Sequence, residues 1–308
     1  MCEKQATKQQ TMKKSYLFAG LTILFWATIP SAFKIALSHV SFVELLFYSI
    51  VTTLIILFSI LLMQGRVSEL FTYSRKQYIS SIILGFLNPF LYYLILLKAY
   101  SLLPAQVAQP LNFTWPIVLV FMSILILKQK IRPVNFIALF ISFIGVYLIS
   151  SEGDPFNLKF AEPLGVFLAV GSSIIWSLFW LLNVKDKRDE VAKLFLNFLF
   201  ALVFIIPVHV TLAGTSVPSL NGLLACGYVG AFEMGITFVL WLKALKHAPT
   251  TANVSNLIYL TPFFALIFIN FVLGETILLT TVIGLIFIIS GIITQEISNQ
   301  KRKKYESR

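Results

Sequence analysis

The sequence has little charge and little cysteine. Only 12% of its 308 residues are charged, whereas typical soluble domains have about a quarter. Of the two cysteines, Cys2 lies in a polar tail and Cys226 in an apolar segment, so neither a disulfide framework nor a cysteine-based metal site is expected. The composition therefore argues against both the ordinary soluble class and the disulfide-rich class.

The signatures of common enzymes are also absent. The sequence has no GxGxxG, P-loop, HExxH or GxSxG pattern. Its three histidines, His39, His209 and His247, are far apart and have no metal-ligand spacing. We therefore expect no enzyme activity, no cofactor and no metal.

Apolar sequence is what the chain has in abundance, since 58% of its residues are hydrophobic. A bilayer core about 30 Å thick needs roughly 20 apolar helical residues to cross it. Windows of that length predict an all-α integral membrane protein with ten transmembrane helices. These lie near residues 15–37, 42–62, 79–98, 104–127, 133–150, 162–184, 192–213, 221–244, 248–273 and 277–296.

The basic residues predict the orientation. The net charge is +11, but Lys and Arg lie in short connections between apolar runs, which fits membrane topology better than a nucleic-acid partner. With ten helices, all but three of the 24 Lys and Arg fall on the side that holds both termini; the exceptions are Lys34, Lys98 and Lys159. This predicts a multi-pass protein of the inner or plasma membrane with both termini cytoplasmic and a basic C-terminal tail near membrane lipid.

The chain consists of two related halves. The stretch LKAYSLLPA, residues 97–105, returns as LKALKHAPT, residues 242–250, and the same register pairs Gly85 with Gly230. With one inserted residue, Pro116 pairs with Pro262. The predicted segments are a cytoplasmic tail at 1–14, a five-helix repeat at 15–150, an outer linker at 151–161, a second five-helix repeat at 162–296 and a basic cytoplasmic tail at 297–308.

An odd number of helices in each repeat has a topological consequence. The second repeat enters the membrane from the side opposite the first, so the fold is predicted as two inverted five-helix repeats. In such folds the substrate site lies where the repeats meet, and transport proceeds by alternating access. A small-molecule solute is therefore the expected partner, and a channel is disfavoured because no symmetric ring of filter residues is predicted.

Several motifs are distinctive. They are Trp26 and Trp176 in the leading helices of the two halves, the junction LYYLILLKAYSLLPAQVA between the third and fourth helices, and the segment FVLGETILLTTVIGLIFIISGII near the end of the chain. With these motifs, residues 15–296 resemble the drug/metabolite transporter (DMT) superfamily, specifically its EamA-type exporters. The pair Gly274-Glu275 precedes the last helix of the second half, whereas Lys128-Gln129 stands at that place in the first half.

The resemblance implies export of a small organic metabolite, such as an amino acid, driven by the proton gradient. LNFTWPIVLVF is similar to the fourth helix of aromatic amino acid exporters of that superfamily. One alternative is a facilitator or importer of the same fold. An alternative of another class is an intramembrane transferase, which would need a carboxylate pair or a metal-ligand set facing a lipid substrate.

Polar and helix-breaking residues at membrane depth indicate where a solute could bind. In the fourth helix, Pro110 and Pro116 remove the donors that would bond the carbonyls of Gln106 and Asn112. Gln106, Gln109 and Asn112 recur every three residues and so lie within about 120° on one helical face. We expect this face to line a neutral cavity; the alternative is that the amides only hold helices together.

The ninth helix repeats this design with Asn253, Asn256 and Tyr259 ahead of Pro262. These residues are expected to line the same cavity. Tryptophans of the interior, Trp115 and Trp176, could stack on an aromatic solute, although packing is the alternative role.

Glu233 is the candidate for proton coupling. It falls in the middle of the helix predicted at 221–244, where a carboxylate opposes insertion by roughly 3 kcal/mol. Such a group either carries a proton or serves as a hydrogen-bonded structural residue. Its counterpart in the first half is Asn88, which we place in the cavity, so coupling would be carried by one half alone.

Overall fold

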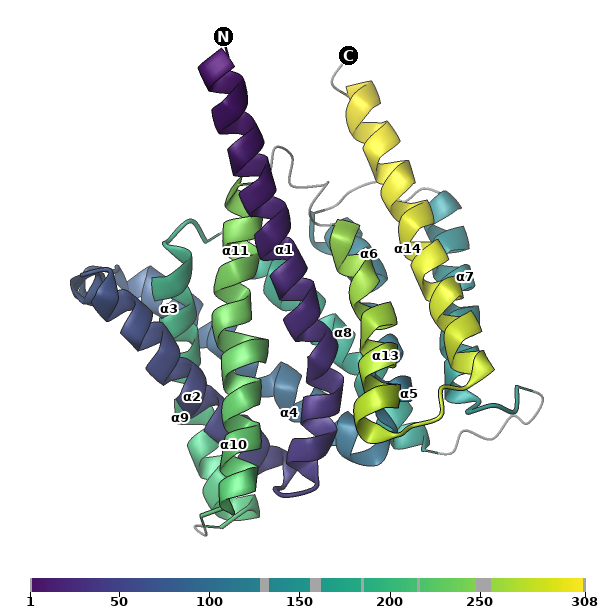
Figure 1. Cartoon of the computed structure of the whole chain (residues 1–308), viewed down its shortest axis with the longest axis horizontal. Coiled ribbons are helices and arrows are strands. Elements are labelled where there is room, and N and C mark those ends of the chain that lie inside the picture. The colour runs from purple at the N-terminus through teal and green to yellow at the C-terminus, as the bar shows by residue number, and fades with distance from the viewer. Residues whose placement is uncertain are drawn as a thin grey trace. The chain divides into compact units, whose positions relative to one another are not determined.

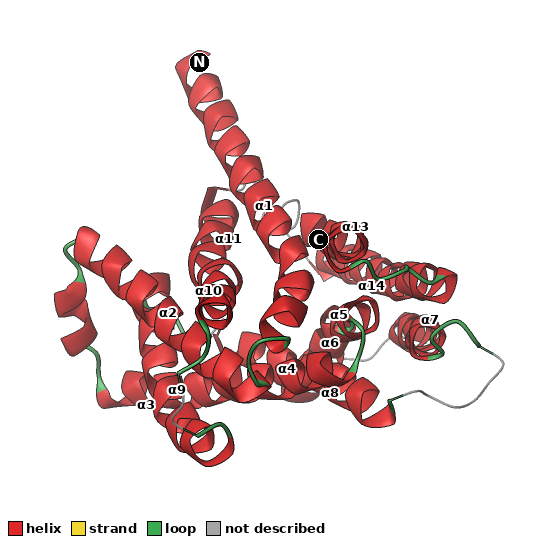
Figure 2. Cartoon of the chain, turned by 60° about the horizontal axis from the view of Figure 1, so that its bottom comes forward, coloured by secondary structure: helices red, strands yellow, loops and turns green. Residues whose placement is uncertain are grey.

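The structure, a computed structural model of the chain, describes residues 2–127, 133–155, 162–183, 186–214, 217–247 and 256–306. Every regular element in these residues is a helix, as Figure 2 shows. Six helices in this part of the chain are long and apolar enough to cross a membrane, and three shorter apolar helices accompany them. The predicted all-α membrane class is confirmed at this level.

The chain divides into two compact units. Unit 1 contains Met1–Phe90 and Lys187–Leu273, and unit 2 contains Leu91–Asp186 and Gly274–Arg308. Each unit combines segments from both predicted repeats, because the repeats are defined by sequence and the units by packing. The division by contacts therefore does not follow the division at 151–161.

Unit 1 is built around two long helices, α1 and α2. Helix α1 packs against α10, α11 and α13, while α2 packs against α9, α10 and η3, and α3 packs against α9. Figure 1 shows α1 running beside α11. The bounds are α1 Cys2–Leu37, α2 Phe42–Met63, η1 Val67–Phe71, α3 Arg75–Gly85, α9 Glu190–Leu212, α10 Leu220–Val229, η3 Gly230–Gly235, α11 Ile236–His247, η4 Asn256–Leu260 and α13 Thr261–Leu273.

Unit 2 is built around α8 and a separate pair of helices. Helix α8 packs against α4, α5 and α6, and α7 packs along α14, a pairing that is visible in Figure 1. The π-helix η2, Phe86–Leu91, leads from unit 1 into unit 2. The bounds in unit 2 are α4 Tyr92–Leu102, α5 Ala105–Asn112, α6 Trp115–Leu127, α7 Pro133–Ser150, α8 Pro163–Asn183 and α14 Leu279–Glu306.

Two spans are interrupted by π-helical turns at corresponding places. One is η2, where Asn88 has the non-helical angles φ −148° and ψ 121° and Pro89 follows. The other is η3, which lies between α10 and α11 and contains Glu233. Short π-helical stretches inside longer helices are frequent at functional sites, because they release backbone groups from the regular pattern.

Glycines permit the closest helix crossings in unit 1. A Cβ on Gly85 of α3 would clash with the backbone carbonyl of Asn197 in α9, and a Cβ on Gly230 of η3 would clash with the carbonyl of Ser49 in α2. Thr53 Oγ1 lies within 2.8 Å of the carbonyl oxygen of Gly230. Small residues of this kind allow membrane helices to approach closely and pack.

The helix ends differ from the prediction at the two termini. The structure extends α1 back to Cys2 and α14 forward to Glu306, although 1–14 and 297–308 are predicted as tails.

Ser41 and Glu44 form a capping box that begins α2, with Ser41 N donating to a Glu44 carboxylate oxygen at 2.8 Å. Such reciprocal bonds satisfy backbone donors that the first helical turn leaves unpaired.

Candidate solute-binding residues

The fourth predicted span is broken in the structure. Helix α5 ends at Asn112, Phe113 and Thr114 form a turn, and α6 begins at Trp115. Pro110 inside α5 and Pro116 in the first turn of α6 supply no N–H, so the regular ladder of hydrogen bonds cannot continue across this region. The break exposes backbone groups at the place where the polar residues of α5 lie.

The corresponding part of the ninth predicted span is irregular as well. The 3₁₀ turn η4 ends at Leu260, and α13 begins at Thr261 with Pro262 in its first turn. Asn253 lies outside the described residues, and only the backbone of Asn256 is described. Tyr259 is half-buried and packs on a cluster that includes Trp241.

Asn112 joins three helices of unit 2. Its side-chain nitrogen donates to Ser172 Oγ of α8 at 2.8 Å, and its side-chain oxygen accepts from the Tyr92 hydroxyl of α4 at 3.2 Å. The Asn112 side chain is half-buried. A neutral amide in this position can exchange its hydroxyl partners for groups of a solute.

Gln109 lies one turn before Asn112 and is also half-buried. Its side-chain oxygen accepts from the hydroxyl of Tyr100 at 2.7 Å. The two amides therefore share one face of α5, as the three-residue spacing predicts, and each is bonded to a tyrosine of α4.

Gln106 has a different position, since both ends of its amide are bonded. The side-chain nitrogen donates to the carbonyl of Thr276 at 2.9 Å, and the side-chain oxygen accepts from the N–H of Leu278 at 3.0 Å. The Glu275 carboxylate accepts from the backbone N–H groups of Ala105 and Gln106. These contacts connect the start of α5 to the segment before α14.

Aromatic rings pack against Tyr92, the tyrosine that bonds Asn112. The rings of Tyr92 and Trp176 lie 4.7 Å apart between centroids, and Trp115 meets Trp176 edge to face at 6.5 Å. Ser177 Oγ donates to the carbonyl of Trp115 at 3.0 Å, which ties α8 to the start of α6. In unit 2, Asn112 is therefore connected to Trp176 through Tyr92, and Trp115 contacts the same tryptophan.

Unit 1 has a second aromatic group around Trp26. The Trp26 ring lies 5.8 Å from that of Trp241 and 5.9 Å from that of Phe238. Its indole N–H donates to the carbonyl oxygen of Glu233 at 3.3 Å, which is a backbone group in the π-helical turn η3. Glu233 itself is half-buried. Trp26 and the candidate for proton coupling are therefore direct neighbours.

Asn88 lies in unit 1 and is almost completely buried at 2% exposure. Within the described part of the chain, its side-chain oxygen has no hydrogen-bond partner. A buried carbonyl without a donor is destabilising, so this oxygen is available to a water molecule or a solute group.

Tyr92, Tyr100 and Ser172 were not predicted from the sequence, because hydroxyl groups are common in membrane helices and have no distinctive spacing.

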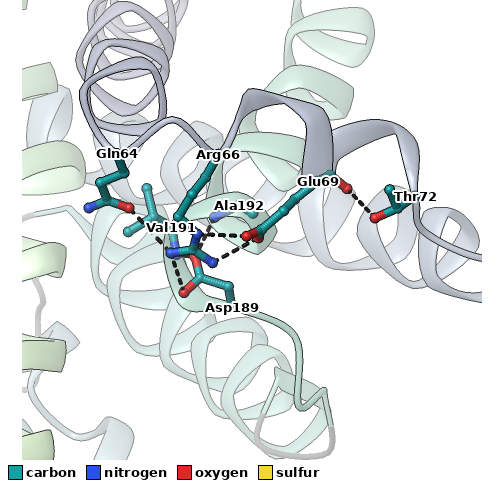
Figure 3. A network of polar contacts seen from close by, with 7 residues as sticks. All are labelled: Gln64, Arg66, Glu69, Thr72, Asp189, Val191 and Ala192. Atoms are coloured by element: carbon teal, nitrogen blue, oxygen red, sulfur yellow. Dashed lines mark hydrogen bonds and ion pairs between the residues drawn. The ribbon is translucent and has the colours of Figure 1, made fainter.

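A polar network lies where α2 and η1 meet the start of α9 (Figure 3). Two guanidinium nitrogens of Arg66 bond the Glu69 carboxylate at 2.7 Å, and a third reaches Asp189 at 3.0 Å. Asp189 also caps α9 by accepting from the N–H groups of Val191 and Ala192. The hydrogen bonds from Arg66 lower the pKa of Glu69, and the same contacts raise the pKa of Arg66.

Arg188 shows that one residue of a predicted loop is buried. Its side chain donates to Ser81 Oγ at 2.8 Å, and its guanidinium carbon lies 5.1 Å from the ring centroid of Tyr73.

Among the described residues, no group of three His, Cys, Asp or Glu is arranged to hold a metal ion.

Comparison with known proteins identifies a matching family. The family model "EamA-like transporter family" matches the chain twice, at residues 13–151 and 163–294. An uncharacterized transporter of Clostridium kluyveri is 25% identical over 300 residues, covering 94% of this chain and 95% of that protein. An uncharacterized transporter of Archaeoglobus fulgidus is 25% identical over 286 residues, covering 91% and 96%.

More distant similarity supports the same fold. The uncharacterized transporter YvbV of Bacillus subtilis is 21% identical over 292 residues, covering 92% of each chain. A crystal structure of another protein superposes with a TM-score of 0.64 at 17% identity, covering 94% of this chain and 99% of that one. At this level of identity the superposition shows the fold alone.

Proposed function

The chain belongs to the EamA-like transporter family, and from this premise we propose that it moves a small organic solute across the cell membrane by alternating access. The predicted membership of the DMT superfamily is confirmed, and the chain is a multi-pass membrane protein related to proteins named as transporters. Family membership also favours a transporter over an enzyme. The solute, its direction and its coupling to protons are our proposals.

Inverted repeats are the basis of the proposed mechanism. The family model matches each half separately, and from the five spans predicted in each half we infer that the two copies have opposite orientations. The irregular turns support this relation: α6 begins at Trp115 and α13 at Thr261, immediately before the paired residues Pro116 and Pro262.

The glycine contacts support the same relation. Gly85 and Gly230 are paired in the sequence alignment, and each packs on a backbone carbonyl of the second helix of the other repeat. In unit 2, Gly145 of α7 and Gly284 of α14 each pack on the carbonyl of the other. Contacts that exchange between repeats are those expected from a pseudo-two-fold axis.

The observation that carries the proposed solute class is the hydrogen bonding of Asn112. A half-buried amide meets two hydroxyl groups beside the Trp176 ring, in a helix broken by prolines. Neutral donors and acceptors with an aromatic wall suit a zwitterionic or polyfunctional organic solute, such as an amino acid, better than a bare ion. Gln109 and Trp115 are further proposed contacts in unit 2, whereas Asn88, Asn253, Asn256 and Tyr259 remain proposals that rest on the sequence pattern.

Proton coupling is proposed at Glu233. The bond from Trp26 to the Glu233 carbonyl connects a tryptophan of α1 to the turn that bears the carboxylate. A change in protonation at Glu233 can therefore alter the packing of η3 against α1. Proton flow in one direction would then drive the solute in the other.

The experiment that tests this function is counterflow in proteoliposomes that contain the purified full-length chain. A panel of labelled amino acids and other small metabolites is offered with and without a pH gradient. We expect saturable exchange of at least one solute, and accumulation of it when the gradient is imposed. Exchange without gradient-driven accumulation would support the facilitator alternative, while direction-selective uptake would support an importer.

The intramembrane transferase alternative makes a different prediction. It requires release of a modified lipid when the chain is supplied with lipid and a group donor. Lipid analysis of the same proteoliposomes measures this directly. A turnover-dependent lipid product without solute exchange would replace the transport proposal.

Orientation is tested separately. We propose that both termini are cytoplasmic and that the chain resides in the inner or plasma membrane, as the distribution of Lys and Arg indicates. Single cysteines introduced at Ser101 and Gln64 should react with a membrane-impermeant thiol reagent from opposite sides of the membrane. Reaction from the same side would contradict the helix count between them.

A further inference from the structure

Unit 1 contains a buried histidine that the proposed transport mechanism does not use. His209 lies near the end of α9 and is 7% exposed. Its ring lies 4.3 Å from that of Phe47 at an interplanar angle of 39°, and 5.9 Å from that of Tyr48 at 84°. The imidazole is therefore enclosed by the rings of α2.

One nitrogen of this ring has an unused hydrogen-bonding capacity. Nε2 of His209 is buried and has no hydrogen-bond partner among the residues that the structure describes. Buried polar atoms are nearly always bonded, so an exception in a membrane span requires an explanation. A histidine nitrogen can accept a hydrogen bond when neutral and donate one when protonated, so it can serve a ligand that the protein itself does not contain.

The surroundings can accommodate both charge states of the ring. A neutral imidazole stacks on Phe47 as an apolar ring, whereas an imidazolium gains from the electron-rich faces of aromatic rings. His209 also lies in the last turn of α9, where the helix dipole favours a positive charge. The site is therefore suited to a group that changes its charge.

The titratable groups at the His209 end of unit 1 come from α2, from α10 and from the connection between α1 and α2. On α2, Glu44 precedes Tyr48 by one helical turn and provides a carboxylate at the same end of the unit. Cys226 of α10 is next to this region, since its carbonyl accepts from Ser49 Oγ at 3.1 Å. His39 lies in the exposed connection from α1 to α2.

The other titratable groups of the elements packed on α9 lie at its opposite end. Phe58 of α2 meets Phe195 of α9, so the two helices run antiparallel and Asp189 is about 30 Å from His209 along α9. Ser15 bonds Ala244 far from the α1–α2 connection, which places Lys243 of α11 at that distant end. The groups at the Asp189 end are Arg66, Glu69, Arg75, Lys76, Tyr78, Arg188, Glu190 and Lys193.

We propose that His209 is a proton-binding site of this transporter, and that it exchanges its proton with water at the end of unit 1 that contains Tyr48 and Glu44. The inference depends on the proposed function only where it gives His209 a role in transport. The binding of a proton to His209 is a property of unit 1 alone. It adds a titratable group to the proposed coupling residue Glu233, which lies in a different turn and on a different helix.

The test is an NMR titration of the full-length chain in lipid nanodiscs with ¹⁵N-labelled histidine side chains. The signal of His209 is assigned by its loss in His209→Gln. His39→Gln is the matched control, because it removes an exposed histidine from the same end of the unit. If His209→Gln does not fold, the assignment is made by elimination with His39→Gln and His247→Gln.

We expect the ring nitrogens of His209 to change reversibly between neutral and protonated signals as the pH is varied over the range in which the chain stays folded. Tyr48→Phe is expected to shift that transition, whereas Tyr16→Phe, on an exposed site of α1, should not. A His209 ring that stays in one protonation state over this range overturns the proposal. This readout needs no solute, so it is independent of whether the counterflow experiment succeeds.

Discussion

The Glu275 carboxylate accepts a hydrogen bond from the backbone N–H of Gln106 at 3.1 Å. A residue from the far end of the sequence thereby satisfies a donor in the first turn of α5. Ala105 makes the same kind of bond to the other carboxylate oxygen at 3.0 Å. The broken helix that bears Gln109 and Asn112 is consequently positioned by a segment about 170 residues away in the sequence.

Glu275→Ala should destabilise unit 2 because it removes the acceptor for both donors. Loss of an N-terminal cap costs about 0.5–2 kcal/mol. We expect a lower midpoint of thermal unfolding for the detergent-solubilised chain, and Glu162→Ala on an exposed site is the control. An unchanged midpoint for Glu275→Ala would show that the cap has no role in stability.

Asn112→Leu should weaken solute binding without unfolding the chain. The leucine side chain has the same branching and number of non-hydrogen atoms as asparagine but cannot bond the hydroxyls of Tyr92 and Ser172 or a solute. Two lost hydrogen bonds predict a rise of about tenfold or more in the half-saturating solute concentration of counterflow. Asn221→Leu, at an exposed position of α10, should leave that concentration unchanged; equal effects of the two variants would argue against Asn112 as a contact.

Glu233→Gln should separate proton-driven transport from exchange. Glutamine keeps hydrogen-bonding capacity but cannot release a proton, so accumulation under a pH gradient should stop while counterflow continues. Both activities are measured in the same proteoliposomes. Unchanged dependence on the pH gradient would show that Glu233 is a structural residue.

Gly230→Ala should force η3 away from α2. A Cβ at this position meets the Ser49 carbonyl and Thr52, and overpacking of a fitted interface costs about 1–3 kcal/mol. We expect a lower unfolding midpoint than for Gly227→Ala, where a Cβ meets no atom within 4 Å. Similar midpoints for the two variants would contradict the close crossing.

The network of Arg66 and Glu69 should stabilise the fold less in acid. The pKa of Glu69 is lowered in the folded state by the hydrogen bonds from Arg66, so the contribution is complete above the unfolded pKa and disappears as the pH falls through the folded pKa. The difference in unfolding midpoint between the natural chain and Glu69→Gln should shrink below about pH 4. Since both side chains are partly exposed, high salt should reduce the same difference.

Much of the fold could be predicted because the bilayer imposes simple rules. Long apolar runs become helices. Within the described residues, six predicted spans correspond to helices long and apolar enough to cross a membrane and three to shorter apolar helices, while the fourth predicted span is divided into α5 and α6. The prolines in the fourth predicted span indicate its break. The polar spacing of Gln109 and Asn112 correctly places them on one face.

The partners of these residues could not be predicted. Gln106 has the same spacing as Gln109 and Asn112, yet its amide bonds Thr276 and Leu278. Nothing local in the sequence distinguishes the three residues, because their roles depend on which distant segment lies beside each one. The enclosure of His209 by Phe47 and Tyr48 likewise follows from the antiparallel packing of α2 and α9.

The sequence by itself determined the all-α membrane class of this protein and its family, and it predicts the ten spans and the two halves, because hydrophobic length and helix-breaking residues act locally along the chain. Tertiary structure alone decided that each unit combines both halves, that Glu275 caps α5 and that His209 is buried with an unbonded nitrogen. These features arise from contacts between segments far apart in the chain. The distances and the burial in those contacts are set by the packing of the folded chain and not by neighbours in the sequence.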